Sequence, residues 1–143
     1  MRFMVLMIPA ARARMESGEI PDAKLIEPMM KYNTELAKAG VLLALDGLHS
    51  SSKGARISFK GGKPTVKDGP FTEAREVIGG YWMWQVKSKE EAVEWAKRCP
   101  AEEGDTLELR QVFEMSEFGA EVAKQEGGRA AEIGARLAKN KLK

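Results

Sequence analysis

The alternation of apolar and polar positions divides most of the chain into strands and helices in regular order. Residues 2–8 are almost all apolar, which is typical of a strand near the centre of a sheet. The strongest strand signal comes later, where Trp82, Trp84 and Val86 share one face and Tyr81, Met83 and Gln85 the other, so that both faces are expected to be covered. The predicted strands are, in order, residues 2–8, 41–49, 81–86 and 106–113.

Two helices are predicted between these strands. The first has an apolar face at 4-3-4 spacing, made by Leu25, Met29, Tyr32 and Leu36. Asp22 is a candidate N-cap, but Pro28 would then lie inside the helix, so we expect the regular part to begin at Pro28 and to end at Gly40. The second helix begins with a capping box formed by Ser88 and Glu91.

A hairpin is inserted before the third strand. Residues 55–60 alternate, and Gly61-Gly62 forms a tight turn into residues 63–66. The order of elements is the split β-α-β order, which predicts an α+β fold of ferredoxin-like type with an antiparallel sheet and two helices on one face. The other face needs cover, which a homodimer with two sheets packed face to face would provide through an isologous interface.

The last residues differ in character from the rest. We expect one domain over residues 1–119 and a helical tail over 120–143, in which Ile133 and Leu137 are the large apolar pair at helical spacing. A short amphipathic helix is predicted over 128–139. It is docked loosely, exchanged with a neighbouring subunit, or frayed.

Composition narrows the class of protein. The 143 residues are 43% hydrophobic and 31% charged with a net charge of +2, which fits one globular domain and gives no electrostatic footprint for nucleic acid. No apolar run approaches the roughly 20 residues that span a bilayer. The single cysteine, Cys99, fits a reducing compartment, and we expect a cytoplasmic protein. One His and one Cys do not make a zinc site of the common Cys/His type.

Four short motifs occur in a fixed order and resemble the YCII-related family, in its DGPF-domain branch. They are Asp68-Gly-Pro-Phe71, Gly79-Gly-Tyr81, Ser88-x-x-Glu91-Ala92 and Glu94-Trp-Ala96. The resemblance covers residues 1–119 and implies a ferredoxin-like domain that dimerises as an α+β barrel. It also implies genes that lie near, or are fused to, sigma factors of the extracytoplasmic-function type. Similar barrels include isomerases, dehalogenases and monooxygenases that use neither metal nor organic cofactor, so we expect no cofactor.

The same resemblance brings a suggested active site with a paired His and Asp. Asp68 is a candidate general base, although Asp-Gly-Pro also suits a turn that the carboxylate caps itself. His49 is the only imidazole in the chain and ends a predicted strand, where it either projects into a cleft or is simply exposed. No motif aligns His49 with a catalytic histidine of the family.

Further candidates concern ligand binding. Arg110 alternates away from the apolar face of the last strand, so it either binds an anionic ligand or forms an ion pair with a neighbour of Glu108 on an adjacent strand. Tyr81 and Met83 share a face and line either an apolar pocket or a dimer interface. Phe71, in the same loop as Asp68, is a fourth candidate.

Two functions of different classes follow. The first is a cofactor-independent lyase or isomerase that uses Asp68, with or without His49, for proton transfer on a small carbonyl compound or aromatic acid whose carboxylate Arg110 holds. The second is a non-catalytic, dimeric small-molecule-binding or regulatory module linked to sigma-factor signalling. The expected partners are a second copy, through the open sheet face, and a small anionic or aromatic ligand, with no nucleic acid and no membrane.

Overall fold

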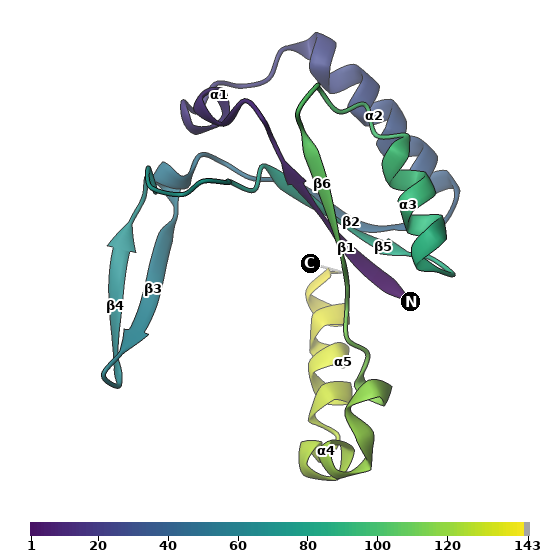
Figure 1. The fold of residues 1–143 in the computed structure, drawn as a ribbon. Helices are drawn as coiled ribbons and strands as arrows, with labels where there is room; N and C mark the ends of the chain where they lie inside the picture. Colours follow the sequence, from purple (N-terminus) through teal and green to yellow (C-terminus); the bar gives the residue numbers. More distant parts are fainter. Residues whose placement is uncertain (142–143) are drawn as a thin grey trace. The chain divides into compact units, whose positions relative to one another are not determined.

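A computed structural model describes residues 1–141 and has an α+β fold (Figure 1). The chain divides into two compact units, Met1–Gln111 and Val112–Lys143. The first unit contains a four-stranded antiparallel sheet in the order β2-β5-β1-β6. Its strands are β1 (Arg2–Ile8), β2 (Leu42–Gly47), β5 (Gly80–Gln85) and β6 (Thr106–Gln111). This is the ferredoxin-like strand order that the sequence predicts.

Helices α2 (Ala23–Lys38) and α3 (Lys89–Lys97) cover one face of that sheet (Figure 1). The prediction that the first helix becomes regular only at Pro28 is wrong. Asp22 caps the helix by accepting the Lys24 N–H at 3.1 Å, and its carbonyl also accepts the Leu25 N–H at 2.9 Å. These bonds close the first turn and offset the one helical bond that Pro28 cannot make.

The core lies between the sheet and the two helices. Asn33 of α2 accepts the indole N–H of Trp82 at 2.8 Å, which satisfies both buried groups. Tyr32 donates its hydroxyl to the Trp95 carbonyl at 2.8 Å, and burial raises the pKa of Tyr32, so the hydroxyl keeps its proton. The buried apolar members are Phe3, Val5, Tyr32, Leu36, Val41, Trp82, Trp84, Val86 and Ala92.

The cap of α3 differs in one detail from the predicted box. The Ser88 hydroxyl accepts the Glu91 N–H at 3.1 Å, as expected, but the Glu91 carboxylate accepts the N–H of Lys87 at 2.7 Å. The hydrogen bonds of the Ser88 hydroxyl and the Glu91 carboxylate nevertheless both stabilise the start of α3.

The face of the sheet opposite the helices is a mixture of apolar and charged residues. Met4 of β1 stands between Met83 of β5 and Arg110 of β6, and all three alternate away from the core. The next row contains Leu6, Tyr81 and Glu108. We call this surface the open face.

The predicted hairpin is confirmed and stands apart from the sheet. Strands β3 (Ala55–Lys60) and β4 (Lys63–Asp68) pair only with each other and project as an arm (Figure 1). The turn residues Gly61 and Gly62 have φ of 60° and 76°, a left-handed conformation that both central positions of a type I′ turn require. Two short helical segments lie near the base of the arm, α1 (Arg12–Glu16) and the 3₁₀ turn η1 (Ser51–Lys53).

The second unit is helical. It contains the 3₁₀ turn η2 (Met115–Phe118), α4 (Gly119–Glu126) and α5 (Arg129–Lys141). The predicted tail helix corresponds to α5, whereas α4 was not predicted; Gly127, with φ of 61°, ends it. Residues 142–143 of the predicted tail lie outside the described residues. Within residues 1–141, no helix is both long enough and apolar enough to cross a bilayer.

Candidate functional site

Ser51 joins three segments that are distant in the sequence. Its N–H donates to one carboxylate oxygen of Glu16 at 3.0 Å, and its hydroxyl donates to the other oxygen. The same hydroxyl oxygen accepts the N–H of Phe71 at 3.0 Å. The neighbouring Ser50 hydroxyl donates to the Glu16 carbonyl at 2.9 Å. We call this set, Glu16, Ser50, Ser51 and Phe71, the Ser51 clamp.

The clamp is held together by a charged acceptor. The Ser51 hydroxyl and then the Ser51 N–H stabilise the carboxylate of Glu16, and Arg12 adds a smaller attraction, so the pKa of Glu16 lies below its ordinary value of 4.5. Hydrogen bonds to an ionised acceptor are stronger than those between neutral groups. Glu16 therefore anchors the loop that follows β2.

Gly69 fits the clamp because it has no side chain. A Cβ on Gly69 would lie 1.7 Å from the carbonyl oxygen of Ser51, which is impossible for any other residue without movement of the backbone. The Gly69 N–H also donates to the Gly54 carbonyl at 2.9 Å, and the Gly69–Pro70 peptide bond is cis. The glycine of the Asp-Gly-Pro-Phe motif thus has a steric explanation.

Arginine side chains fix the rest of that motif. Arg12 donates to the carbonyls of Thr72 at 2.8 Å and Phe71 at 3.2 Å. The guanidinium of Arg56 lies 4.1 Å from the centre of the Phe71 ring, a cation–π contact. Phe71 is therefore held on both its backbone and its ring at the base of the arm.

Asp68 lies at the end of β4, opposite Ala55, and is exposed. Among the described residues, none forms a hydrogen bond or ion pair with its carboxylate, so the expectation that Asp68 caps its own turn is not met. The backbone contacts of Gly69 and Phe71 make that turn instead.

Two adjoining cavities lie beside the clamp, at the edge of the sheet next to α2. The larger, of about 610 Å³, contains the polar side chains Arg14, His49 and Ser50 together with the acids Glu19 and Asp22. The smaller, of about 320 Å³, is mainly apolar. Its lining includes Met7, Leu25, Ile26, Met29, Met30, Leu45, Tyr81 and Trp82.

The two cavities share part of their lining and together form one cleft with unlike ends. Pro21, Leu25, Gly47 and Gly79 border both. Arg14, at the polar end, forms an ion pair with Glu102 at 2.6 Å. A cleft of this kind fits a small molecule whose body is apolar and whose one polar group reaches the His49 end.

The predicted site residues fall into three places. His49 lines the larger cavity and Tyr81 the smaller one. Asp68 and Phe71 lie at the base of the arm, whereas Met83 and Arg110 belong to the open face, which Tyr81 also shares. Neither cavity includes Asp68 in its lining.

Two side chains of the predicted set are engaged locally. Arg110 is largely exposed, and its guanidinium lies 3.6 Å from the carboxylate of Glu108 on its own strand, β6, whereas the expected ion-pair alternative placed the partner on an adjacent strand. The Tyr81 hydroxyl donates to Asp46 at 2.7 Å, and this hydrogen bond raises the pKa of Tyr81. Cys99 is not an activated nucleophile, because burial raises the pKa of its thiol to about 11.

Sequence reasoning did not find Glu16, Ser51 or Arg12. Glu16 and Ser51 are 35 residues apart, and neither belongs to a local pattern that marks a hydrogen-bond network. The one signal in the sequence is the Ser50-Ser51-Ser52 run, whose composition indicates a loop and nothing more. Across residues 1–141, no group of His, Cys, Asp and Glu side chains is arranged to hold a metal ion.

Comparison with known families decides the classification. The family model described as the YCII-related domain matches residues 1–116. The chain belongs to the YCII-related domain family. The family that the sequence motifs resemble is thereby confirmed, and the assignment to its DGPF branch stays a prediction. No curated protein matches the chain.

All features of the candidate site lie within the matched part of this YCII-related domain. The Ser51 clamp spans residues 16–71, and the lining of the two cavities ends at Trp82. The Asp-Gly-Pro-Phe motif fixes the loop that carries His49 and Ser50, because Phe71 donates to Ser51. The motif thereby helps to position two residues that line the larger cavity.

We expect Glu16→Gln to loosen the loop around Ser51. Because the pKa of Glu16 is lowered in the fold, its stabilisation is fully present above about pH 4.5 and is lost as the pH falls through the lower folded-state pKa. Hydrogen exchange should show the Ser51 and Phe71 amides roughly five- to tenfold less protected in the variant at neutral pH. In the wild type, the same loss should appear only on acidification.

Glu19→Gln is the matched control for that experiment, since Glu19 lies three residues away and outside the clamp. Equal protection of both amides in wild type and Glu16→Gln would contradict the proposed anchor.

A second prediction concerns Gly69→Ala. The added Cβ meets the Ser51 carbonyl, so the backbone has to shift, and we expect a loss of about 2–4 kcal/mol in the free energy of unfolding measured with urea. Gly54→Ala is the control, because its Cβ would lie 3.5 Å from the same oxygen, an ordinary contact. Its expected effect is below about 0.5 kcal/mol. Similar stabilities for the two variants would refute the steric explanation.

Proposed function

We propose that this YCII-related domain protein binds a small, largely apolar molecule with one polar group and acts on it by proton transfer through His49. The observation that carries the proposal is the cleft itself, whose apolar end adjoins an end that contains the chain's one imidazole. Imidazole changes its protonation most readily near neutral pH, so it suits a general acid or base. The reaction class is that of a lyase or isomerase, and it requires no cofactor.

His49 carries the proton in this proposal, and Asp68 does not. His49 lines the larger cavity, whereas Asp68 is exposed at the end of β4 and borders neither cavity. Proton transfer requires the acid or base to come within hydrogen-bonding reach of the substrate. In this proposal Asp68 takes no part in the reaction and is simply the residue that precedes Gly69, the glycine that the fold requires.

A second candidate is a non-catalytic sensor of apolar small molecules, of the regulatory kind that the family resemblance associates with sigma factors. The composition of the cleft favours it, because four methionines line the two cavities: Met7, Met15, Met29 and Met30. Thioether side chains are flexible and polarisable, and they are common at surfaces that accept several ligands. Both candidates require the same ligand-binding cleft.

The proposal includes a homodimer through the open face. Met4, Leu6 and Met83 form an apolar group there on the side away from the helices, and each is only half-buried. Two copies related by a twofold axis would cover these side chains mutually. Arg110 and Glu108, on β6, would form the polar border of such an interface.

Ligand binding is tested by filling the cleft. Leu25 borders both cavities and is 43% exposed, so Leu25→Trp should fill the cleft without disturbing the core. We expect at least a roughly tenfold loss of affinity for the aromatic probe 8-anilinonaphthalene-1-sulfonate, measured by fluorescence titration. Leu43→Trp is the control, because Leu43 is 47% exposed and borders neither cavity. Equal losses for the two variants would contradict the assignment of the cleft.

Catalysis is tested by a screen of small carbonyl acids in D₂O, with incorporation of deuterium measured by NMR. His49→Ala should lower the exchange rate of a compound that responds by about 100-fold or more, while affinity changes by less than about threefold. Asp68→Asn should leave the rate unchanged. Loss of exchange in Asp68→Asn alone would assign the chemistry to the base of the arm, and binding without exchange in any compound would favour the sensor.

A further inference from the structure

The connection between β1 and α2, residues 9–22, is attached to the rest of the first unit along its first half (Figure 1). The N–H of Ala10 donates to the Asp105 carboxylate at 2.9 Å. Further along, Arg14 pairs with Glu102 at 2.6 Å, and the Ser51 clamp holds the last residue of α1. These contacts fix the position of the connection as far as the end of α1.

The next five residues, 17–21, have no such attachment. Among the described residues, all of their hydrogen bonds end within residues 13–19. These bonds run from Ser17 to Ala13 and Arg14, from Gly18 to Met15, and from Glu19 to Ser17. Every residue of the segment is exposed. A segment with so few contacts to the rest of a fold opens and closes at little cost in free energy. We call residues 17–21 the flap.

The flap is attached again at its far end. Asp22 caps α2 by accepting the Lys24 N–H at 3.1 Å, and Pro21 fixes its own φ just before that cap. At the near end Gly18 has φ of 78°, and a Cβ there would meet no atom within 4 Å, so neighbouring atoms do not prevent its dihedral angles from changing. The flap is thus a short unattached segment between two fixed points, the arrangement of a hinged loop.

The flap forms one wall of the larger cavity. Gly18, Glu19, Ile20 and Pro21 all line that cavity, which also contains His49. Ile20 is 89% exposed, the highest value among the exposed large hydrophobic side chains of the described residues. A single exposed isoleucine is ordinary on a protein surface. This one, however, belongs to the unattached part of a cavity wall.

Other parts of the same cavity are held by hydrogen bonds. The Leu48 N–H donates to the Gly79 carbonyl at 2.9 Å, and Ser50 belongs to the clamp. Leu25 is part of α2. A ligand in the larger cavity would therefore contact both fixed residues and the unattached flap.

From these observations we infer that the flap closes over the cleft when a ligand binds and that Ile20 then covers the polar group of the ligand beside His49. The inference rests on the ligand-binding cleft of the proposed function, and it applies to a catalyst and to a sensor alike. Closure removes water from the His49 end, where it strengthens the electrostatic interactions of the ligand. The Ile20 side chain leaves water only in the bound state, so its apolar area contributes to binding and not to folding.

Titration of the full chain with 8-anilinonaphthalene-1-sulfonate tests the flap. We expect Ile20→Ser to lower the affinity for this probe, and to raise its dissociation rate measured by stopped-flow fluorescence, by about fivefold or more. Because Ile20 is exposed in the free protein, the urea midpoint of unfolding should not change.

Ile57→Ser is the matched control for that titration, because Ile57 is 53% exposed on the arm and borders neither cavity. It should change affinity and dissociation rate by less than about twofold. Effects of Ile20→Ser no larger than those of Ile57→Ser would overturn the inference.

Limited proteolysis reports the closure itself. A glutamyl endopeptidase cleaves after exposed glutamates, and Glu19 lies within the flap. Saturating probe should slow cleavage after Glu19 by about fivefold or more in the wild type, because cleavage follows the population of the open form. In Ile20→Ser saturated with probe, cleavage should be as fast as in the same variant without probe.

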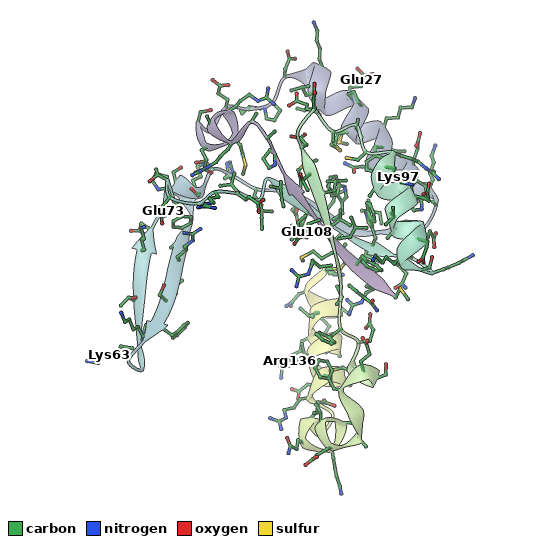
Figure 2. The ribbon with its side chains drawn as sticks, viewed as in Figure 1. Glu27, Lys63, Glu73, Lys97, Glu108 and Arg136 are labelled. Carbon is green, nitrogen blue, oxygen red and sulfur yellow. The ribbon has the colours of Figure 1, made fainter. Side chains whose placement is uncertain are left out.

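Glu73 gives the control site for proteolysis. Figure 2 shows Glu73 at the base of the arm, it borders neither cavity, and cleavage after it should not respond to the probe. Cleavage after Glu19 that the probe leaves unchanged in the wild type would overturn the closure. Equal slowing in the wild type and in Ile20→Ser would overturn the role of Ile20.

The variant Leu25→Trp separates this inference from the proposed function. Loss of probe affinity in Leu25→Trp, with no effect of Ile20→Ser, would leave the cleft as the ligand site and overturn the flap. Loss of affinity in both variants supports the flap. No effect of either variant would overturn the flap together with the cleft.

Discussion

The hydrogen bonds of Ser51 to Glu16 and Phe71 are the interaction on which the functional part of the molecule depends. They hold the loop after β2, which places His49 in the lining of the larger cavity. The same Ser51 also holds Phe71 at the base of the arm. An ionised carboxylate is a strong hydrogen-bond acceptor, and both carboxylate oxygens of Glu16 accept hydrogen bonds from Ser51. The position of the cleft and the attachment of the arm are therefore not independent.

The two faces of the sheet have different surroundings. One face is closed by α2 and α3, where Asn33 accepts the indole N–H of Trp82, whereas the buried indole N–H of Trp84 has no hydrogen-bond partner among the described residues. The open face keeps Met4 and Met83 side by side with charged neighbours on β6. Because the helices cover only one face, the proposed partner would contact the open face, and the proposed ligand would enter at the edge of the sheet beside α2.

The Asp-Gly-Pro-Phe motif illustrates how a conspicuous motif serves architecture. Gly69 is required because a Cβ there would clash with the Ser51 carbonyl, and the Phe71 ring contacts the Arg56 guanidinium while its backbone N–H donates to Ser51. The Asp68 backbone pairs with Ala55 in the arm, but its carboxylate has no hydrogen-bond or ion-pair partner among the described residues. The chemistry of the proposal therefore moves from the motif to His49, which the motif helps to position through the clamp.

Hydrophobic periodicity was sufficient for the four strands of the sheet, the two helices that cover it and their order, and so for the α+β fold, since each of these elements buries a face that its own residues determine. It also identified the Trp82 and Trp84 core face and the hairpin with its two-glycine turn. It could not decide that Asp22 starts α2 despite Pro28, because that depends on competing hydrogen bonds.

The sequence by itself thus determined the fold of residues 1–111 and a set of candidate residues that included His49. Only the tertiary structure decided that His49 and Asp68 lie in different places and that Glu16, 35 residues from Ser51, anchors the loop between them. Local patterns record which face a residue occupies. Contacts between distant loops depend on how the chain closes in space, and no period in the sequence encodes them.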